Sequence, residues 1–357
     1  MTLYYSTYQV LYKHIFAEYF HIFARVATRK VFRWDVELDR LAPTKWYTVT
    51  MQDVLAQIKS GALVCPRSGQ TLVMDEAQAH LVTPDGCSRY LLLNGTVPIL
   101  LVDEEAMRDY AGDSARMTAE YAQEKPAPRR SLLLRLLRRL VYRGGEPQVS
   151  DYRTQASVDA ADRVLTGTPA DAICLSVGGG PGLGAFTNLN IGPFPNVDVV
   201  ADAHALPYAD GSVHAIYCEA VIEHLYDPQQ AVKEMHRVLK PGGMVFAGTP
   251  FIYHYHGYPH HYQNFTLQGH ENLFRRAGFH IIESGTCVGP VHAMVLSIAV
   301  FLAQYCTSGL GRFVSRLWNF SSQYLYPLDR RINTRPNAHM LAATTFVLAK
   351  KEAAPNS

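Results

Sequence analysis

Short apolar runs alternate with segments of helical periodicity between residues 151 and 350. The runs of strand length lie at 172–177, 244–249, 279–288 and 341–350. Helices are expected at 157–165, from Asp227 to Leu239 and from Thr266 to Gly278, because Asp and Thr favour helix starts and Gly often ends a helix. Strands that alternate with helices predict an α/β domain. The aromatic-rich residues 289–340 interrupt this alternation and are expected to form a helical insertion.

The run ICLSVGGGPG at residues 173–182 places four glycines within five residues, directly after a buried-strand pattern. A strand that ends in such a loop can bring its backbone close to a ligand, because glycine lacks the Cβ that would collide with it. Glycine-rich turns of this kind serve nucleotide, dinucleotide and adenosyl cofactors alike. The run therefore predicts a cofactor site without identifying the cofactor.

Three further motifs follow this loop. They are DAHALP at 202–207, EAVIEHL at 219–225 and VLKPGG at 238–243. Together with the glycine loop they resemble the class I S-adenosylmethionine-dependent methyltransferases, most closely the type-11 group, over residues 171–279 with a weaker match to residue 350. The resemblance implies a Rossmann-like sheet, mostly parallel with an antiparallel last strand, and S-adenosylmethionine as the cofactor.

The same resemblance assigns a set of cofactor-binding residues. They are Gly178, Gly180, Gly182, Asn190, Asp202, Ala203, Glu219 and His224. The glycines would pass under the amino-acid and ribose parts of the cofactor, and Asp202 with Ala203 would receive the adenine. Asn190 stands where related proteins bind the ribose through a carboxylate, and an amide lacks the charge-assisted strength of that contact. Glu219 and His224 would face the cofactor or the acceptor; the alternative for His224 is a helix-end histidine bonded to the backbone.

The segment PFIYHYHGYPHHYQNFT at residues 250–266 marks the acceptor side in this resemblance. Related proteins carry Asp and Arg where this chain has His261 and Asn264, which leaves the acceptor class open. A histidine is a suitable general base for a hydroxyl acceptor. His256 matches the histidine of the family and is the first candidate catalytic residue, followed by His260 and His261. Four histidines in eight residues could also ligate a metal, but the segment contains no carboxylate, so no metal is expected.

The residues before 151 divide into three parts. Residues 1–50 are an aromatic-rich segment in which no motif indicates a function. Residues 51–103 resemble a small zinc-ribbon domain, but Ser68 replaces one cysteine of the first knuckle, and Cys87 lacks a second cysteine nearby. Tetrahedral structural zinc needs four ligands, so a degenerate ribbon without metal is expected. Residues 104–150 form a linker with a basic amphipathic helix at 129–143, which could cover the protein's own apolar surface, contact an anionic membrane or touch RNA.

The spacing of the motifs limits the helices of the domain at 151–350. Eight residues separate Gly182 from Asn190, and twelve separate Asn190 from Asp202. A parallel crossover that contains a helix needs about a dozen residues or more. We therefore predict that one flank of the sheet lacks its first two helices and that N-terminal segments cover its apolar surface.

The composition limits the expected cellular location and the expected binding partners. The chain has 33 basic and 31 acidic residues and a net charge of +2, which gives no general phosphate-binding field and disfavours nucleic acid. Six separated cysteines fit a cytoplasmic location, with residues 129–143 as a contact to the inner membrane face. The chain opens without a signal-peptide pattern, and the apolar run 293–305 is shorter than the ~20 residues that span a bilayer.

These observations predict a methyltransferase that acts on oxygen, and in second place on nitrogen, of a small-molecule, glycan or lipid-linked acceptor. Two alternatives stay open. The altered acceptor loop and Asn190 would also suit a catalytically degenerate binding or scaffold protein, and the Arg-rich helix would suit a nucleic-acid methyltransferase. A nicotinamide dehydrogenase shares the glycine loop but not the motifs at 202–207 and 238–243.

Overall fold

The computed structural model describes residues 49–75, 80–103, 152–169, 171–178, 186–192, 197–257 and 260–353. The chain from Thr48 onward forms one compact unit. Gly180, Gly182 and the basic helix expected at 129–143 lie outside the described residues, as does the segment 1–50 except for its last two residues.

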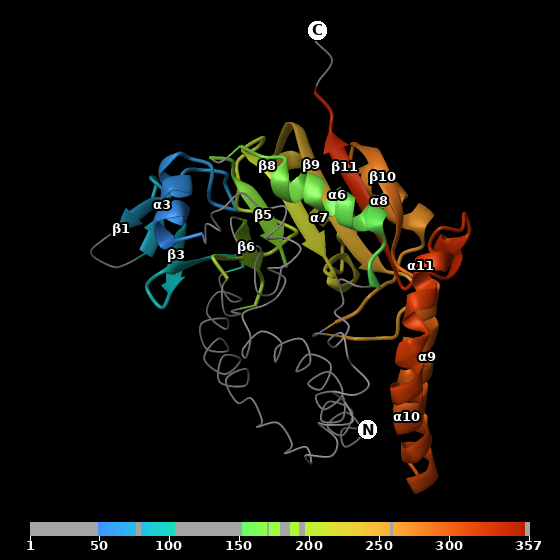
Figure 1. The fold of residues 1–357 in the computed structure, drawn as a ribbon. Coiled ribbons are helices and arrows are strands. Elements are labelled where there is room, and N and C mark those ends of the chain that lie inside the picture. Colours follow the sequence, from blue (N-terminus) through green and yellow to red (C-terminus); the bar gives the residue numbers. More distant parts are fainter. Residues whose placement is uncertain are drawn as a thin grey trace. The chain divides into compact units, whose positions relative to one another are not determined.

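The described strands form one sheet in the order β1-β2-β3-β4-β7-β6-β5-β8-β9-β11-β10 (Figure 1). Their bounds are β1 Val73–Asp75, β2 His80–Val82, β3 Arg89–Leu93, β4 Val97–Leu100, β5 Cys174–Val177, β6 Thr187–Asn190, β7 Val199–Ala201, β8 Val213–Glu219, β9 Leu239–Pro250, β10 Phe279–Val288 and β11 Thr344–Lys351. From β4 to β9 in this order, every pair is parallel, whereas β11 lies antiparallel between β9 and β10. Within residues 151–350, the predicted α/β sheet, mostly parallel with an antiparallel last strand, is confirmed.

The described α-helices are α3 Met51–Lys59, α6 Gln155–Thr166, α7 Pro228–Val238, α8 Leu267–Arg276, α9 Pro290–Tyr305, α10 Gly309–Ser321 and α11 Asp329–Ile332. The starts of α6, α7 and α8 lie within two residues of the predicted ones, whereas the sequence did not predict α3. Asp227 caps α7 and Thr266 caps α8, each by accepting a backbone N–H, at 3.0 and 3.1 Å. Leu239, predicted on the helix, instead begins β9. Pro241 disfavours helical backbone at Lys240, so the helix cannot continue through this segment.

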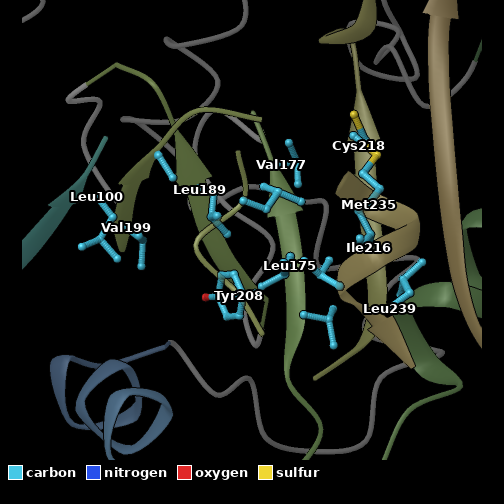
Figure 2. Close-up of a cluster of buried hydrophobic side chains, with 14 of the residues drawn as sticks. Leu100, Leu175, Val177, Leu189, Val199, Tyr208, Ile216, Cys218, Met235 and Leu239 are labelled. Atoms are coloured by element: carbon cyan, nitrogen blue, oxygen red, sulfur yellow. The ribbon is translucent and has the colours of Figure 1, made fainter. Parts of the chain in front are cut away.

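One flank of the sheet is covered by the N-terminal helix α3. Most residues of the β5–β6 and β6–β7 connections lie outside the described part of the chain, so the absence of the first two helices stays a prediction. Gln57 of α3 donates to Thr187 Oγ1 of β6 at 3.0 Å and accepts from Tyr208 Oη at 2.9 Å. Ile58 is buried in the same core as Leu189 of β6. Figure 2 shows the strand side of this core, with Leu175, Leu189 and Val199 near Tyr208.

The four strands between residues 73 and 100 extend the main sheet, because β4 pairs with β7. Cys65 is buried, with its Sγ 3.0 Å from Tyr90 Oη, and Cys87 is exposed. Among the described residues, neither cysteine belongs to a cluster with metal-ligand geometry. A separate, zinc-ribbon-like domain over 51–103 stays a prediction.

The insertion at 289–340 is helical, as predicted. Helices α9 and α10 contact each other and form a long hairpin (Figure 1). Asp329 of α11 holds the first turn of α9 by accepting the N–H groups of Val291 and His292, each at 2.9 Å. Helix α10 exposes apolar side chains such as Leu310 and Phe313. Of the helices in the described part of the chain, none has the length and apolar character needed to cross a bilayer.

His270 of α8 makes the stability of the fold sensitive to acid. It is fully buried with Nδ1 3.1 Å from Thr345 Oγ1, and burial lowers its pKa from 6.5 to about 3. The unfolded chain takes up this proton below about pH 6.5 while the folded chain does not. Above about pH 6.5, burial of the neutral His270 therefore causes no pH-dependent loss of stability. Between about pH 6.5 and pH 3, the free energy of unfolding falls by about 1.4 kcal/mol for each pH unit.

Chemical denaturation of His270→Gln should therefore show a shallower loss of unfolding free energy between about pH 6 and pH 4 than the unchanged chain does. His280, which is exposed, supplies the control: His280→Gln should keep the steeper pH dependence. Equal slopes for all three proteins would contradict the assignment to His270.

Candidate functional site

The predicted cofactor residues gather at the edge of the sheet where four parallel strands end. Gly178 follows β5, Asn190 ends β6, Asp202 follows β7 and Glu219 ends β8. The chain passes from β5 through β6 to β7 on one side and then continues with β8 on the other side of β5. Ligands of open α/β sheets bind outside the carboxyl ends of the strands at such a topological switch point. The fold thus brings these four residues to the edge where a cofactor is expected.

Gly178 is the one residue of the proposed cofactor-binding glycines that the structure describes. Its φ is +69°, and its N–H donates to the Leu189 carbonyl at 2.7 Å. A Cβ built on Gly178 would lie 2.3 Å from Val221 Cγ2. Glycine is required here by the left-handed backbone and by the packing of Val221. A contact of Gly178, Gly180 and Gly182 with a cofactor stays a prediction.

Asn190 and Ala203 make contacts within the protein itself. Asn190 Oδ1 accepts the Gly192 N–H at 3.0 Å and thereby closes a turn after β6. Ala203 is partly buried and packs against the main core. Their contacts with ribose and adenine stay predictions; Asn190 could use Nδ2 or the second lone pair of Oδ1, and Ala203 its backbone.

Asp202 keeps one carboxylate oxygen available. Its Oδ1 accepts the His204 N–H at 2.9 Å and lies 2.6 Å from His204 Nδ1. The Asp227 N–H donates to His204 Nε2 at 3.3 Å, so Nδ1 carries the hydrogen that is donated to Asp202. Burial would raise the pKa of Asp202, but the hydrogen bonds from His204 outweigh it and hold the pKa below its ordinary value. Oδ2 of this charged group has no hydrogen-bond partner among the described residues and can accept from a ligand.

Glu219 forms a largely buried network with Arg153 and Tyr217. The Arg153 guanidinium donates a short hydrogen bond to Glu219 Oε1, and Tyr217 Oη donates to Oε2 at 2.5 Å. Burial would lower the pKa of Arg153, but the charge of Glu219 raises it above its ordinary value. Burial and the same carboxylate raise the pKa of Tyr217. Glu219 lies at the predicted edge, but both of its oxygens are already engaged inside the protein.

A second cluster forms beside β8 and β9, where Glu223, His224 and His256 meet. Glu223 and His224 lie on the 3-10 turn η2, Ile222–His224, and His256 lies in the segment after β9. Glu223 Oε1 is 3.6 Å from His256 Nε2 and 3.8 Å from His224 Nε2. The Glu223 side chain has no exposed surface, and His256 is 8% exposed. His224 Nδ1 lies 2.5 Å from the His260 carbonyl, which is the backbone contact considered from the sequence.

The remaining histidines of this loop differ in their surroundings. His261 accepts the His256 N–H through Nδ1 at 3.1 Å, and its Nε2 lies 2.7 Å from Asn264 Oδ1. These two residues, which replace the Asp and Arg of related proteins, thus bond to each other. Burial lowers the pKa of His261 and, to about 4, that of His254. The ring of His260 is exposed.

Sequence reasoning missed two members of this edge. Arg153 precedes the first strand of the domain and bonds to Glu219, which lies 66 residues further along the sequence. No local motif therefore predicts this pair. Glu223 stands in the EAVIEHL motif, and its position beside His224 was the available signal. The expectation of no metal considered only the segment 250–266, whereas the carboxylate that joins its histidines comes from η2.

Comparisons with known proteins agree with the resemblance in the central part of the chain. Residues 186–247, which run from just before β6 into β9, match a family described as a methyltransferase domain. An uncharacterized chloroplastic methyltransferase of Arabidopsis thaliana is 38% identical over 92 residues, 25% of each chain. A "probable S-adenosylmethionine-dependent methyltransferase" of Mycolicibacterium smegmatis is 43% identical over 58 residues, 16% of this chain and 23% of the relative.

A further relative, an uncharacterized methyltransferase of Mycobacterium tuberculosis H37Ra, is 35% identical over 139 residues, 31% of this chain and 54% of the relative. A solved structure, Haemonchus contortus phosphoethanolamine N-methyltransferase 2 with S-adenosyl-L-methionine, superposes with a TM-score of 0.35 at 16% identity, over 55% of this chain and 52% of that one. The chain spans between 16% and 54% of the length of the curated relatives it is compared with. The match of residues 186–247 to a methyltransferase domain and the names of these relatives agree with the resemblance that the motifs of the sequence indicate.

Proposed function

We propose that this protein is an S-adenosylmethionine-dependent methyltransferase whose cofactor lies at the carboxyl ends of β5, β6, β7 and β8. The observation that carries the proposal is the family match at 186–247, which covers the strands β6, β7 and β8 beside the switch point. Gly178 and the free Oδ2 of Asp202 fit an adenosyl group, because an amino or hydroxyl donor needs such an acceptor. When bound, the cofactor supplies an activated methyl group that passes to a nucleophile.

The acceptor side of the proposal rests on the histidine loop. His256 lies with Nδ1 3.0 Å from the His254 carbonyl, so Nδ1 carries the hydrogen and Nε2 the lone pair that a general base requires. His260 is the exposed neighbour that can pass a proton to water. These groups suit a hydroxyl acceptor, and we propose O-methylation of a small-molecule, glycan or lipid-linked compound.

Titration with S-adenosylhomocysteine, followed by calorimetry, tests the cofactor assignment. The unchanged chain should bind the ligand, and Asp202→Ala should weaken binding at least about tenfold, or ~1.4 kcal/mol, because a charge-assisted hydrogen bond is lost. His280→Ala, a change of an exposed histidine at the start of β10, should leave the affinity unchanged. An absence of heat at millimolar ligand would contradict the proposal.

One observation favours a second candidate, a binding or scaffold protein without catalytic activity. Both oxygens of Glu219 and Oδ1 of Asn190 are used within the protein and not held ready for a ligand. In this case neither S-adenosylhomocysteine nor a methyl acceptor would bind.

The cellular location of the protein is part of the same proposal. We propose a cytoplasmic enzyme whose helix at 129–143 contacts the inner membrane face when the acceptor is lipid-linked. The +2 net charge gives little support for a nucleic-acid acceptor.

A further inference from the structure

Three potential ligand atoms converge in the cluster formed by Glu223, His224 and His256. One atom from each side chain lies within 4.8 Å of the others, which is a metal-ligand arrangement. Oε1 of Glu223 lies between the two imidazoles, 3.6 Å from one Nε2 and 3.8 Å from the other. Zinc bonds of about 2.0–2.2 Å would hold such ligand atoms roughly 3.3 Å apart, so small side-chain rotations complete the site.

The hydrogen bonds of the two histidines determine which of their nitrogens can be a ligand. His224 Nδ1 faces the carbonyl of His260, and His256 Nδ1 faces the carbonyl of His254. A carbonyl only accepts, so each Nδ1 must carry the hydrogen. In the neutral imidazole, Nε2 then carries a lone pair, and both lone pairs are next to a carboxylate oxygen. A histidine that donates one N–H to a backbone carbonyl is also the usual arrangement behind a metal ligand.

The carboxylate gives a second, independent indication. Glu223 is fully buried, and Oε1 has no hydrogen-bond partner in the part of the chain that the structure describes. Its other oxygen, Oε2, accepts from Thr249 Oγ1 at 3.2 Å, which fixes the plane of the group. A buried carboxylate oxygen without a donor is costly, and a cation between it and two lone pairs removes that cost.

The backbone around the cluster is also held in place. The Tyr262 N–H donates to the Glu223 carbonyl at 2.9 Å, and Gln263 Nε2 donates to the Leu225 carbonyl at 2.8 Å. These bonds tie the histidine loop to η2 and hold Glu223, His224 and His256 together. The cluster is therefore built by two segments that the fold joins, and not by a chance meeting of exposed side chains.

We infer that Glu223, His224 and His256 bind one divalent cation of the zinc class and that its open position takes an oxygen of the methyl acceptor. Two imidazoles and one carboxylate are a donor set that suits zinc and ferrous iron, whereas Mg²⁺ prefers oxygen ligands alone. Three protein ligands leave a coordination position free, as in catalytic zinc sites. The role of the cation in binding a hydroxyl acceptor rests on the proposed function; the cation site itself does not. In this arrangement His256 acts as a ligand, and the cation takes over from it the activation of the hydroxyl.

The test uses the full chain, freed of any affinity tag and stripped with a chelator. Titration with Zn²⁺ should show one site per chain, Mg²⁺ should give no comparable heat, and Co²⁺ should produce the visible absorption of a low-coordinate nitrogen and oxygen site. Glu223→Gln and His256→Gln should each weaken Zn²⁺ binding more than about 100-fold, because each removes a direct ligand. Thr249→Val should weaken it about 10- to 100-fold through loss of the carboxylate's support. The matched control is His260→Gln, an exposed histidine of the same loop, which should bind like the unchanged chain.

The outcomes separate this inference from the proposed function. A chain that binds S-adenosylhomocysteine but shows no single Zn²⁺ site, or whose Zn²⁺ binding is unchanged in both Glu223→Gln and His256→Gln, overturns the inference alone. Zinc binding without cofactor binding would instead keep the cation site and contradict the methyltransferase. If the buried Glu223→Gln does not fold, as judged by circular dichroism, His224→Gln replaces it, because the His224 side chain is 22% exposed.

Discussion

Replacing Arg153 by methionine is expected to lower the free energy of unfolding by about 2–3 kcal/mol, because the change leaves the Glu219 carboxylate without its guanidinium. Removal of one partner from a fully buried pair costs about 3–5 kcal/mol, and the smaller value is expected here since the Glu219 side chain is 35% exposed. Tyr217 would keep its hydrogen bond to Glu219, but its neutral hydroxyl does not balance the charge of the carboxylate. Denaturant unfolding measures the difference.

The chain offers a matched control for this prediction. Arg163 and Glu283 also form an ion pair, at 3.3 Å, but their side chains are 47% and 36% exposed. Arg163→Met should therefore cost less than about 1 kcal/mol, as is usual for surface pairs. The double change Arg153→Met with Glu219→Gln should recover part of the loss, because no unpaired charge remains. Equal costs for Arg153→Met and Arg163→Met would show that the Arg153 network does not stabilise the fold.

Gly178→Ala is expected to destabilise the protein by about 2–5 kcal/mol and to weaken S-adenosylhomocysteine binding at least about tenfold. The left-handed backbone at φ +69° costs an alanine about 1–2 kcal/mol, and the overlap of its Cβ with Val221 at 2.3 Å adds a packing cost of about 1–3 kcal/mol. The backbone shift that relieves this overlap would move the end of β5, where the cofactor is proposed to lie. Unfolding and calorimetric titration report the two effects separately.

A substitution at Gly211 separates the conformational cost from the packing cost. Its φ is +61°, but a Cβ there would meet nothing within 4 Å. Gly211→Ala should thus show the conformational cost alone, about 1–2 kcal/mol, and unchanged ligand binding. The pair Gly178→Ala with Val221→Ala should recover part of the packing cost. A Gly178→Ala protein as stable as Gly211→Ala would contradict the close contact with Val221.

The sheet and its helices could be predicted because their signals are local. Asp227 and Thr266 start helices through hydrogen bonds to residues three positions further on, and such bonds leave a readable pattern. The short distances between Gly182, Asn190 and Asp202 predict that one flank of the sheet lacks two helices. Cover of that flank by N-terminal segments was expected from the need to bury its apolar surface, but no motif identified α3 as the segment.

The candidate site was only partly predictable because its electrostatics depend on long-range pairing. Asp202, Asn190 and Glu219 could be placed at one edge, since they end parallel strands. Their partners were not visible: Arg153 comes from before the first strand of the domain, and a single arginine carries no local signature. Likewise, the histidines of 250–266 were read without Glu223, because only the fold brings η2 beside the end of β9.

The cover that α3 provides has a consequence for how this protein can be shortened. The family match at 186–247 and the motif pattern from 151 onward both suggest a boundary that would cut α3 away. A fragment made on that basis would remove the hydrogen bonds that Tyr208 and Thr187 form with Gln57, together with the buried side chains of Val54 and Ile58. A shortened chain for crystallisation or screening should therefore start ahead of Met51, so that α3 keeps its contacts with β6 and Tyr208.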